Sequence, residues 1–294
     1  MKLHILISVL LLFGSAAAWW QPRPKTSWEI QLQGTIDTTK PVQAYDIDLF
    51  DVPASTIAAL KAQGKKVICY FSAGTYEQWR PDAGSFAQGI LGSPLGDWPG
   101  ERWLDIRNFQ TSGLATVMTK RFDLAVQKRC DAVDMDNVDG FTQKSGFSMT
   151  YQDQLSYNKW LASQAHARGL AAGLKNDLRQ IKDLVPFFDF LVDESCTAYD
   201  ECGMLKPFVD AGKAVFGISY PELGGKNLQT YVCPVVNALN YDWVIKNRLL
   251  GAQPLVQCRS YSSPVAGMSV LSFGMNDCPI LTPLYEGVPP ASNT

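Results

Sequence analysis

Short apolar runs alternate with helix-like segments along most of this chain, and this alternation limits the fold more than any other feature. The predicted strands are Trp28–Gln33, Val42–Leu49, Lys66–Ala73, Ala132–Asp136, Leu170–Lys175, Phe188–Asp193, Ala214–Ser219 and Pro254–Gln257. The predicted helices are Ala54–Gln63, Leu114–Lys128, Ser156–Arg168, Leu178–Leu184 and Met204–Ala211. Gly64, Gly169 and Gly212 follow helices directly, as C-terminal capping glycines do. The alternation indicates a parallel sheet covered by helices.

Eight predicted strands favour a (β/α)8 barrel, the TIM barrel. A doubly wound sheet is the alternative, and such a sheet usually binds a nucleotide through a glycine-rich first turn. The first turn here is Gln33–Asp37, which matches neither GxGxxG nor GxxxxGK[ST]. No linker of biased composition and no internal repeat divides the chain. We therefore predict one α/β domain, a (β/α)8 barrel over residues 19–294.

The first eighteen residues have the pattern of a secretory signal peptide. Lys2 precedes the apolar run Ile5–Phe13, and the small residues Ala16–Ala18 follow as a cleavage site. The apolar run is too short to span a bilayer, and no later stretch reaches the roughly 18 consecutive apolar residues that a membrane helix needs. We expect a secreted protein, extracellular or associated with the cell wall, without a membrane partner.

Seven cysteines in an exported chain predict disulfides and at least one free thiol. Cys69 lies inside an apolar run and Cys130 directly before another. We interpret both as small buried apolar side chains without a partner.

The other cysteines suggest two pairs. Cys196 and Cys202 enclose a short polar loop, which favours a bond between them. Cys233 and Cys258 flank one helical segment and form the second predicted pair. The partner of Cys278 stays open.

Histidine is nearly absent from the mature chain. Once the signal peptide is removed, only His166 remains, in a predicted helix far from any strand end. Ser-His-Asp catalysis, Cys-His catalysis and histidine-ligated metal sites all need a well-placed histidine. We therefore predict no metal and no cofactor, and acid–base chemistry is left to Asp, Glu, Lys and Tyr.

Acids and other polar residues gather at the ends of the predicted strands, where (β/α)8 barrels carry their catalytic residues. The candidates are Asp46, Asp48, Tyr70, Ser72, Asp134, Asp136, Asn137, Lys175, Asn176, Asp177, Asp193, Glu194 and Tyr220. A single acid among them could cap a helix N-terminus, the role that we predict for Asp177. A whole ring of such residues indicates an active site.

Side-chain alternation separates two faces of the fourth predicted strand. Asp134 and Asp136 share one face, directed into the barrel, while Val133 and Met135 face the helices. Asp136 lies nearer the mouth of the barrel, and Glu194 ends the sixth strand on the other side. Two carboxylates so placed can flank a glycosidic bond.

Two metal-binding interpretations of the same strand fit less well. An EF-hand loop that starts at Asp134 needs glycine sixth and glutamate twelfth, but Gly140 is seventh and Ser145 twelfth. The Asp-x-Asp of metal-dependent glycosyltransferases is a two-residue signal that arises often by chance. The secretory signal and the lack of a nucleotide-binding turn in the predicted barrel disfavour the glycosyltransferase interpretation.

The interval from Thr75 to about Gly113, after the third predicted strand, is long for a loop in a compact domain. It carries Trp79, Trp98 and Trp103. These tryptophans could stack on sugar rings, or they could pack a lid onto the barrel. The sequence does not decide between the two.

The segment Cys130–Gly140 (CDAVDMDNVDG) resembles the fourth-strand signature of glycoside hydrolase family 114, the secreted endo-α-1,4-polygalactosaminidases. Other stretches resemble the same family in the expected order: Trp28–Asp37, Tyr45–Asp51, Val67–Asp82, Trp98–Arg107, Gly173–Asp177 and Leu191–Cys196. Met135 departs from the proline or small residue that the family pattern has there, on the face directed away from the cleft. The chain after Tyr220 is less similar.

The resemblance implies a (β/α)8 barrel that cuts partly deacetylated, α-1,4-linked galactosamine polymers internally. It also implies that Asp136 and Glu194 form the catalytic pair. The predicted substrate-binding residues are Asp46, Asp48, Tyr70, Ser72, Asp105, Asp134, Asn137, Lys175, Asn176 and Tyr220.

In the mechanism that we expect, Glu194 protonates the leaving oxygen, and Asp136 attacks the anomeric carbon or directs a water that does. We favour the retaining outcome. The alternative from another class is a non-catalytic polysaccharide-binding barrel, which would bind sugar without creating new reducing ends.

Net charge points to a cationic partner. The chain has 26 Lys and Arg against 28 Asp and Glu, and the acids gather at strand ends. Such a cleft attracts cations, and galactosamine without its acetyl group is a cation near neutral pH. We expect a monomer that binds cationic, galactosamine-containing polysaccharide, and no nucleic acid.

Overall fold

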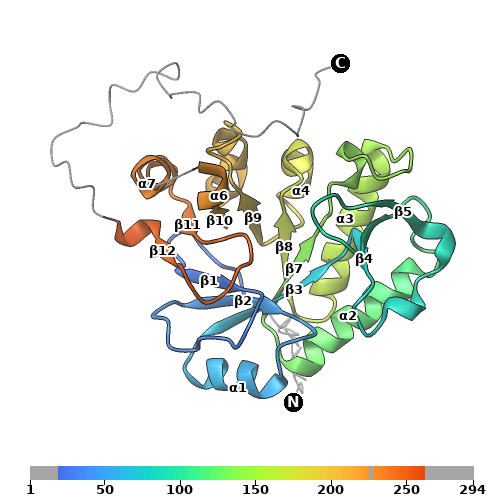
Figure 1. Ribbon diagram of the computed structural model, residues 1–294, viewed down its shortest axis with the longest axis horizontal. Coiled ribbons are helices and arrows are strands. Elements are labelled where there is room, and N and C mark those ends of the chain that lie inside the picture. The colour runs from blue at the N-terminus through green and yellow to red at the C-terminus, as the bar shows by residue number, and fades with distance from the viewer. Residues whose placement is uncertain (1–18, 225–227, 262–294) are drawn as a thin grey trace, which may run out of the picture.

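The computed structural model describes residues 19–224 and 228–261, and its centre is a curled sheet (Figure 1). The strands of this sheet, in spatial order, are β1 (Trp28–Gln31), β2 (Ala44–Asp48), β3 (Lys66–Ser72), β7 (Ala132–Asp136), β8 (Ala171–Lys175), β9 (Phe190–Glu194), β10 (Ala214–Ser219), β11 (Asp242–Ile245) and β12 (Val256–Gln257). Neighbours from β1 to β11 pair in parallel, and β12 is antiparallel to β11. The signal-peptide prediction lies outside the described residues.

Helices surround the outer side of the curled sheet (Figure 1). They are α1 (Ala54–Ala62), α2 (Leu114–Lys128), α3 (Tyr151–His166), α4 (Ile181–Leu184), α5 (Lys206–Asp210), α6 (Pro221–Gly224) and α7 (Gln229–Ala238). Short 3-10 turns are η1 (Ala83–Ser85), η2 (Gln88–Ile90), η3 (Gly140–Thr142), η4 (Leu178–Gln180), η5 (Cys202–Leu205) and η6 (Cys258–Ser260). Helix α3 begins before the predicted Ser156, because Thr150 and Asp153 form a capping box that starts it.

The first and last parallel strands meet through side chains. The Trp28 indole N–H donates to the carbonyl of Asp242 at 2.8 Å. Gln257 donates from its amide to the carbonyl of Trp28 at 2.6 Å, and buried Glu29 pairs with buried Lys246. These contacts join β1 to β11, to the residue that follows β11 and to β12, and the (β/α)8 prediction is confirmed.

The predicted eighth strand was wrong. Pro254–Gln257 contributes only the short antiparallel β12, and the eighth parallel strand is β11. Gly217 on the neighbouring β10 explains why β11 fits here. A β-carbon at Gly217 would lie 1.9 Å from the Trp243 ring, so the missing side chain makes room for this tryptophan.

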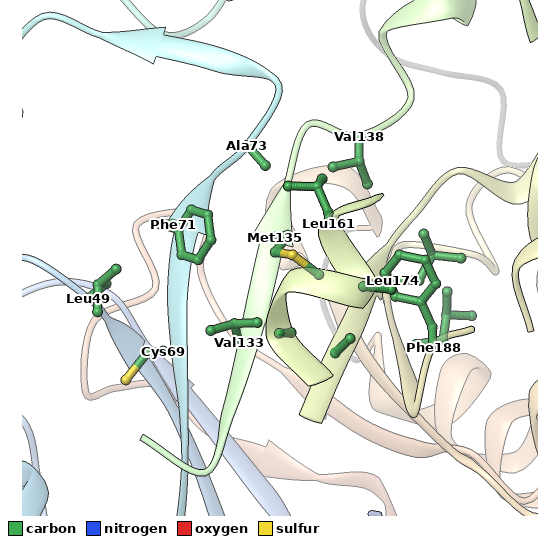
Figure 2. Close-up of a cluster of buried hydrophobic side chains, with 14 of the residues drawn as sticks. Leu49, Cys69, Phe71, Ala73, Val133, Met135, Val138, Leu161, Leu174 and Phe188 are labelled. Carbon is green, nitrogen blue, oxygen red and sulfur yellow. The ribbon is translucent and has the colours of Figure 1, made fainter. Parts of the chain in front are cut away.

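Two apolar cores lie on opposite faces of the sheet. The barrel interior is filled by Trp28, Ile30, Ala44, Ile68, Ala132, Ala171, Phe190, Val192, Ala214, Phe216, Ile218, Tyr220 and Val244. The larger core fills the space between sheet and helices, and Figure 2 shows Met135 and Leu174 there with Leu161 of α3. Val133 and Met135 thus face the helices as predicted. The alternation leaves the inward positions near the C-terminal strand ends to polar residues.

The long interval after β3 folds into a second, antiparallel sheet. Its strands are β4 (Thr75–Glu77), β5 (Leu91–Pro94) and β6 (Glu101–Leu104), in the order β4-β6-β5. Trp103 is 6% exposed and packs against Gly140, so it joins this sheet to the barrel. Trp79 and Trp98 are 49% and 39% exposed. The packing interpretation therefore holds for Trp103, while the other two tryptophans remain accessible to a ligand.

Three disulfides lie within the described residues, and one corrects a prediction. Cys196–Cys202 and Cys233–Cys258 are confirmed. Cys69 and Cys130, predicted to be unpaired, are bonded to each other, with 6.0 Å between their Cα atoms. The pairing of β3 with β7 brings these cysteines together across the long insertion, a contact between distant segments that local sequence does not reveal. Cys278 lies outside the described residues.

The disulfides allow a test of which crosslink stabilises the barrel more. The Cys69–Cys130 bond joins residues 61 apart, so the variant Cys69→Ala/Cys130→Ala should lose about 4 kcal/mol of unfolding free energy. The Cys196–Cys202 bond joins residues 6 apart, and Cys196→Ala/Cys202→Ala should lose about 2 kcal/mol. Urea unfolding without reductant measures both. Equal losses would contradict the dependence on loop length.

Candidate active site

The Asp136 carboxylate lies at the C-terminal end of β7 and accepts three hydrogen bonds. The Tyr70 hydroxyl donates to Oδ2 at 2.7 Å. Lys175 Nζ and the Asn137 backbone N–H donate to Oδ1 at 3.1 and 2.9 Å. Burial by itself raises the pKa of this carboxyl, but the Lys175 charge and the three donors outweigh it, so the pKa lies below its ordinary value. Asp136 is therefore an ionised carboxylate in a fixed orientation.

Lys175, at the end of β8, links the two predicted catalytic acids. It is 4% exposed, and its Nζ lies 3.1 Å from Asp136 Oδ1 and 3.7 Å from Glu194 Oε2. Burial opposes the charged form of the ammonium, but Asp136, Glu194 and Asp134 outweigh burial and raise the Lys175 pKa well above its ordinary value. The ammonium stays charged because it is surrounded by acids.

Glu194, at the end of β9, is held by polar neighbours from two other strands. The Tyr220 hydroxyl donates to Oε1, and Asn176 Nδ2 donates to Oε2 at 3.2 Å. Asn176 also accepts from the Glu194 backbone N–H at 3.2 Å. The Glu194 side chain is 32% exposed and that of Asp136 is 18% exposed. Glu194 is the more accessible of the two acids.

The chain turns sharply directly after each of these three strands. Asn137, Asn176 and Ser195 follow Asp136, Lys175 and Glu194, and their φ angles are 61°, 50° and 61°. This left-handed conformation costs free energy for residues other than glycine, and asparagine tolerates it best. Backbone strain of this kind gathers at functional sites. Here it fixes the point at which each functional side chain leaves its strand.

Asp134 and Asp46 form a buried acidic pair deeper in the barrel. Both are 0% exposed, and none of their four carboxylate oxygens has a hydrogen-bond donor within the described residues. Burial raises the pKa of Asp134 to about 7, with Asp136 and Glu194 adding and Lys175 opposing. Burial and the Asp134 charge raise the pKa of Asp46 well above its ordinary value. One proton shared between the two carboxyls would leave a single negative charge on the pair.

Three other predicted site residues bind side chains beside the cluster. Asp48 forms a bidentate ion pair with Arg80, at 2.6 and 3.0 Å. The Ser72 hydroxyl accepts from Asn137 Nδ2 at 3.1 Å. Asp105 pairs with Arg107 at 2.7 and 2.8 Å, within the insertion.

Asp177 has a different partner from the one predicted. Its side chain makes no helix-capping hydrogen bond and accepts instead from Asn158 Nδ2 at 2.8 Å. Burial and the nearby Asp139 raise the pKa of Asp177 to about 9. The predicted side-chain cap was wrong, because the buried Asn158 of α3 reaches this carboxyl.

The structure thus groups the predicted residues by distance from the catalytic candidates. Those in direct contact with Asp136 or Glu194 are Tyr70, Asn137, Lys175, Asn176 and Tyr220. Sequence reasoning missed Thr75 and Glu101, which belong to the insertion and reach this end of the barrel. Their signals were their place in an unusually long interval and in two of the stretches that resemble the family, Val67–Asp82 and Trp98–Arg107.

His166 takes no part in this cluster. It stacks on Trp19 with 4.0 Å between ring centroids, and its Nε2 lies 2.7 Å from Asp189 Oδ2. Asp189 precedes β9, so the contact lies at the opposite end of the barrel. In the described part of the chain, no group of three or more His, Cys, Asp and Glu side chains is arranged to hold a metal ion. No described helix is long and apolar enough to cross a membrane.

Comparison with known proteins adds to this geometry. The family model "Glycoside-hydrolase family GH114" matches residues 12–263. The crystal structure of Ega3 from Aspergillus fumigatus in complex with galactosamine is 40% identical, covers 82% of this chain and 98% of its own, and has a TM-score of 0.77. The glycoside hydrolase domain of PelA from Pseudomonas aeruginosa shares the fold, at 13% identity and a TM-score of 0.60 over 79% of this chain and 97% of its own. Curated protein sequences gave no match.

The position of Lys175 leads to a prediction about pH. Lys175→Met should raise the Asp136 pKa, because it removes the cation that opposes burial. A higher pH is then needed to ionise Asp136. The acidic limb of the kcat/KM profile should therefore move upward by about one pH unit or more.

Lys66→Met is the matched control. Lys66 also pairs with an aspartate, Asp131 at 3.1 Å, but it begins β3 at the opposite end of the barrel. The kcat/KM profile of the Lys66→Met variant should stay that of the wild type. An unchanged acidic limb in Lys175→Met would refute the role assigned to the ammonium.

Proposed function

Because the chain belongs to glycoside-hydrolase family GH114, we propose that it is an endo-acting hydrolase of α-1,4-linked galactosamine polymers, such as partly deacetylated galactosaminogalactan. The observation that carries this proposal is the pair Asp136 and Glu194, held on either side of the buried Lys175. Glycosidases use two carboxyl groups that flank the scissile bond. The Ega3 complex with galactosamine supports the choice of sugar.

The two acids have different surroundings, which suit different roles. Asp136 has a lowered pKa and is fixed by Tyr70, Lys175 and Asn137. It attacks the anomeric carbon as an ionised nucleophile. Glu194 is more accessible, so it donates its proton to the departing glycosidic oxygen. In the second step, Glu194 takes a proton from water, whose oxygen displaces Asp136 from the sugar.

Lys175 also supports the retaining outcome. The sum of its distances to Asp136 Oδ1 and Glu194 Oε2 is the largest separation that these two oxygens can have. Carboxyl groups stand about 5–5.5 Å apart in retaining enzymes and about 6.5–9.5 Å apart in inverting ones. Contact of both acids with one ammonium is compatible with the shorter, retaining separation. We therefore propose a covalent glycosyl-enzyme intermediate on Asp136.

The electrostatics of the cleft support a cationic polymer as substrate. Asp46, Asp134, Asp136 and Glu194 gather around one ammonium, that of Lys175. Acids in excess over cations attract positive charge, and each deacetylated galactosamine carries an ammonium group. Nucleic acid would be repelled by the same field. We propose that the protein acts outside the cell, since the three disulfides among the described residues suit an oxidising compartment. We also propose that it acts as a monomer.

Reducing-end release tests the substrate. The purified protein should release new reducing ends from deacetylated galactosaminan and far fewer from the fully acetylated polymer. Early products should be oligomers of mixed length, as internal cutting produces. Binding without any release would favour the non-catalytic polysaccharide-binding barrel instead.

Substitution of each acid tests the mechanism. Asp136→Asn and Glu194→Gln should each lower kcat by about 10²–10⁴-fold or more, because each removes a charge or a transferable proton at nearly constant shape. Asp123→Asn provides a control, since Asp123 is an exposed acid on α2 that pairs with Arg168 and contacts neither acid. Wild-type turnover by either acid variant, at an unchanged melting temperature, would remove that residue from the mechanism.

A further inference from the structure

Glu101 lies on the part of the insertion that contacts the catalytic end of the barrel. It begins β6, where it pairs with Glu77 of β4. Side chains two residues apart on a strand share a face, so Glu101 shares its face of the small sheet with Trp103. Trp103 packs against Gly140, which follows β7. The face of the small sheet that carries Glu101 therefore packs against the end of β7, where Asp136 lies.

A short chain of hydrogen bonds connects Glu101 to the catalytic acid. The Thr75 hydroxyl donates to Glu101 Oε2 at 2.9 Å. Asn137 Nδ2 donates to the hydroxyl oxygens of Thr75 and Ser72, at 3.2 and 3.1 Å. The backbone N–H of the same Asn137 donates to Asp136. The orientation of the Glu101 carboxyl is thus fixed relative to Asp136.

Glu101 has no cation of its own. Neighbouring acids are paired: Asp48 and Glu77 bind Arg80, and Asp136 binds Lys175. Within residues 19–224 and 228–261, no Lys, Arg or His nitrogen comes within ion-pair distance of Glu101, and its Oε1 has no hydrogen-bond donor. Yet Glu101 is only 9% exposed. A buried carboxylate without a cation is costly.

We propose that Glu101 is the specificity residue that binds the 2-ammonium group of the galactosamine unit held at Asp136. The 2-amino group is attached to the carbon next to the anomeric carbon, so it must lie close to the nucleophile. Among the described residues, Glu101 is an acid of the insertion that lies on that side of the cleft and forms no ion pair with a protein cation. This inference rests on the proposed function, and it names the contact that would distinguish galactosamine from its N-acetylated form.

The surroundings of Glu101 predict how recognition depends on pH. Burial raises the pKa of Glu101 to about 7; Thr75 opposes this shift, Glu77 and Asp136 add to it, and Arg80 opposes it. The residue must be ionised to bind an ammonium group. The part of the affinity that depends on Glu101 should therefore increase as the pH rises from about 5 to 7, while the amine of the sugar still carries its proton, and this part should be lost with a glutamine at this position.

The test measures binding in a non-cleaving background, so that it does not depend on turnover. The probe is a deacetylated α-1,4-galactosamine oligomer, titrated calorimetrically into Glu194→Gln and into Glu101→Gln/Glu194→Gln. Loss of one charge-assisted hydrogen bond should weaken binding by about 10- to 100-fold at about pH 7, and by less at about pH 5. The fully acetylated oligomer should bind both proteins equally.

The control is Asp123→Asn/Glu194→Gln. Asp123 is an exposed acid on α2 that pairs with Arg168, so this change removes the same charge outside the cleft. It should leave both affinities unchanged. Equal weakening for both oligomers in the Glu101 variant would indicate a structural role and overturn the proposal, as would unchanged binding of the deacetylated oligomer. Failure of the wild type to release reducing ends, with Glu101-dependent binding intact, would overturn only the proposed hydrolase activity.

Discussion

The ion pair between Lys175 and the acids around it is the interaction on which the site depends. A buried ammonium is costly unless its charge is compensated, and Asp136 and Glu194 compensate it from both sides. In return, the ammonium keeps Asp136 ionised although burial favours the neutral acid. Asp134 and Asp46 lie beyond it and can share a proton. The cluster is a single electrostatic unit in which each charge determines the protonation of the others.

Much of this arrangement could be predicted from local sequence. Strand boundaries near the site agree within one or two residues, because alternating apolar and polar positions specify which side chains enter the barrel. That periodicity directed Asp134 and Asp136 inward and Met135 toward the helices. Parallel strands then placed Tyr70, Lys175 and the acids at one end. Contacts among these side chains follow from the two-residue period of each strand and from the order of the parallel strands in the sheet.

What could not be predicted depended on contacts between distant segments. The Cys69–Cys130 bond needs the pairing of β3 with β7 across a long insertion. The eighth strand depends on space that Gly217 leaves for Trp243. The pairing of Asp48 with Arg80 depends on how the insertion folds back. In each case, three-dimensional packing determines which residues become partners. The local sequence of neither segment indicates the contact.

The insertion between β3 and β7 is a loop closed at its base. The disulfide joins its flanks below, and the Asp136 carbonyl accepts from the backbone N–H groups of Ala73 and Gly74 above, at 2.9 and 3.1 Å. Changes of length within the insertion can therefore leave Asp136 in place. The acids proposed to cleave the bond belong to the barrel, whereas Glu101 lies on the enclosed segment. With the roles proposed above, such a barrel can acquire a new sugar preference by exchanging one loop, without rebuilding its catalytic chemistry.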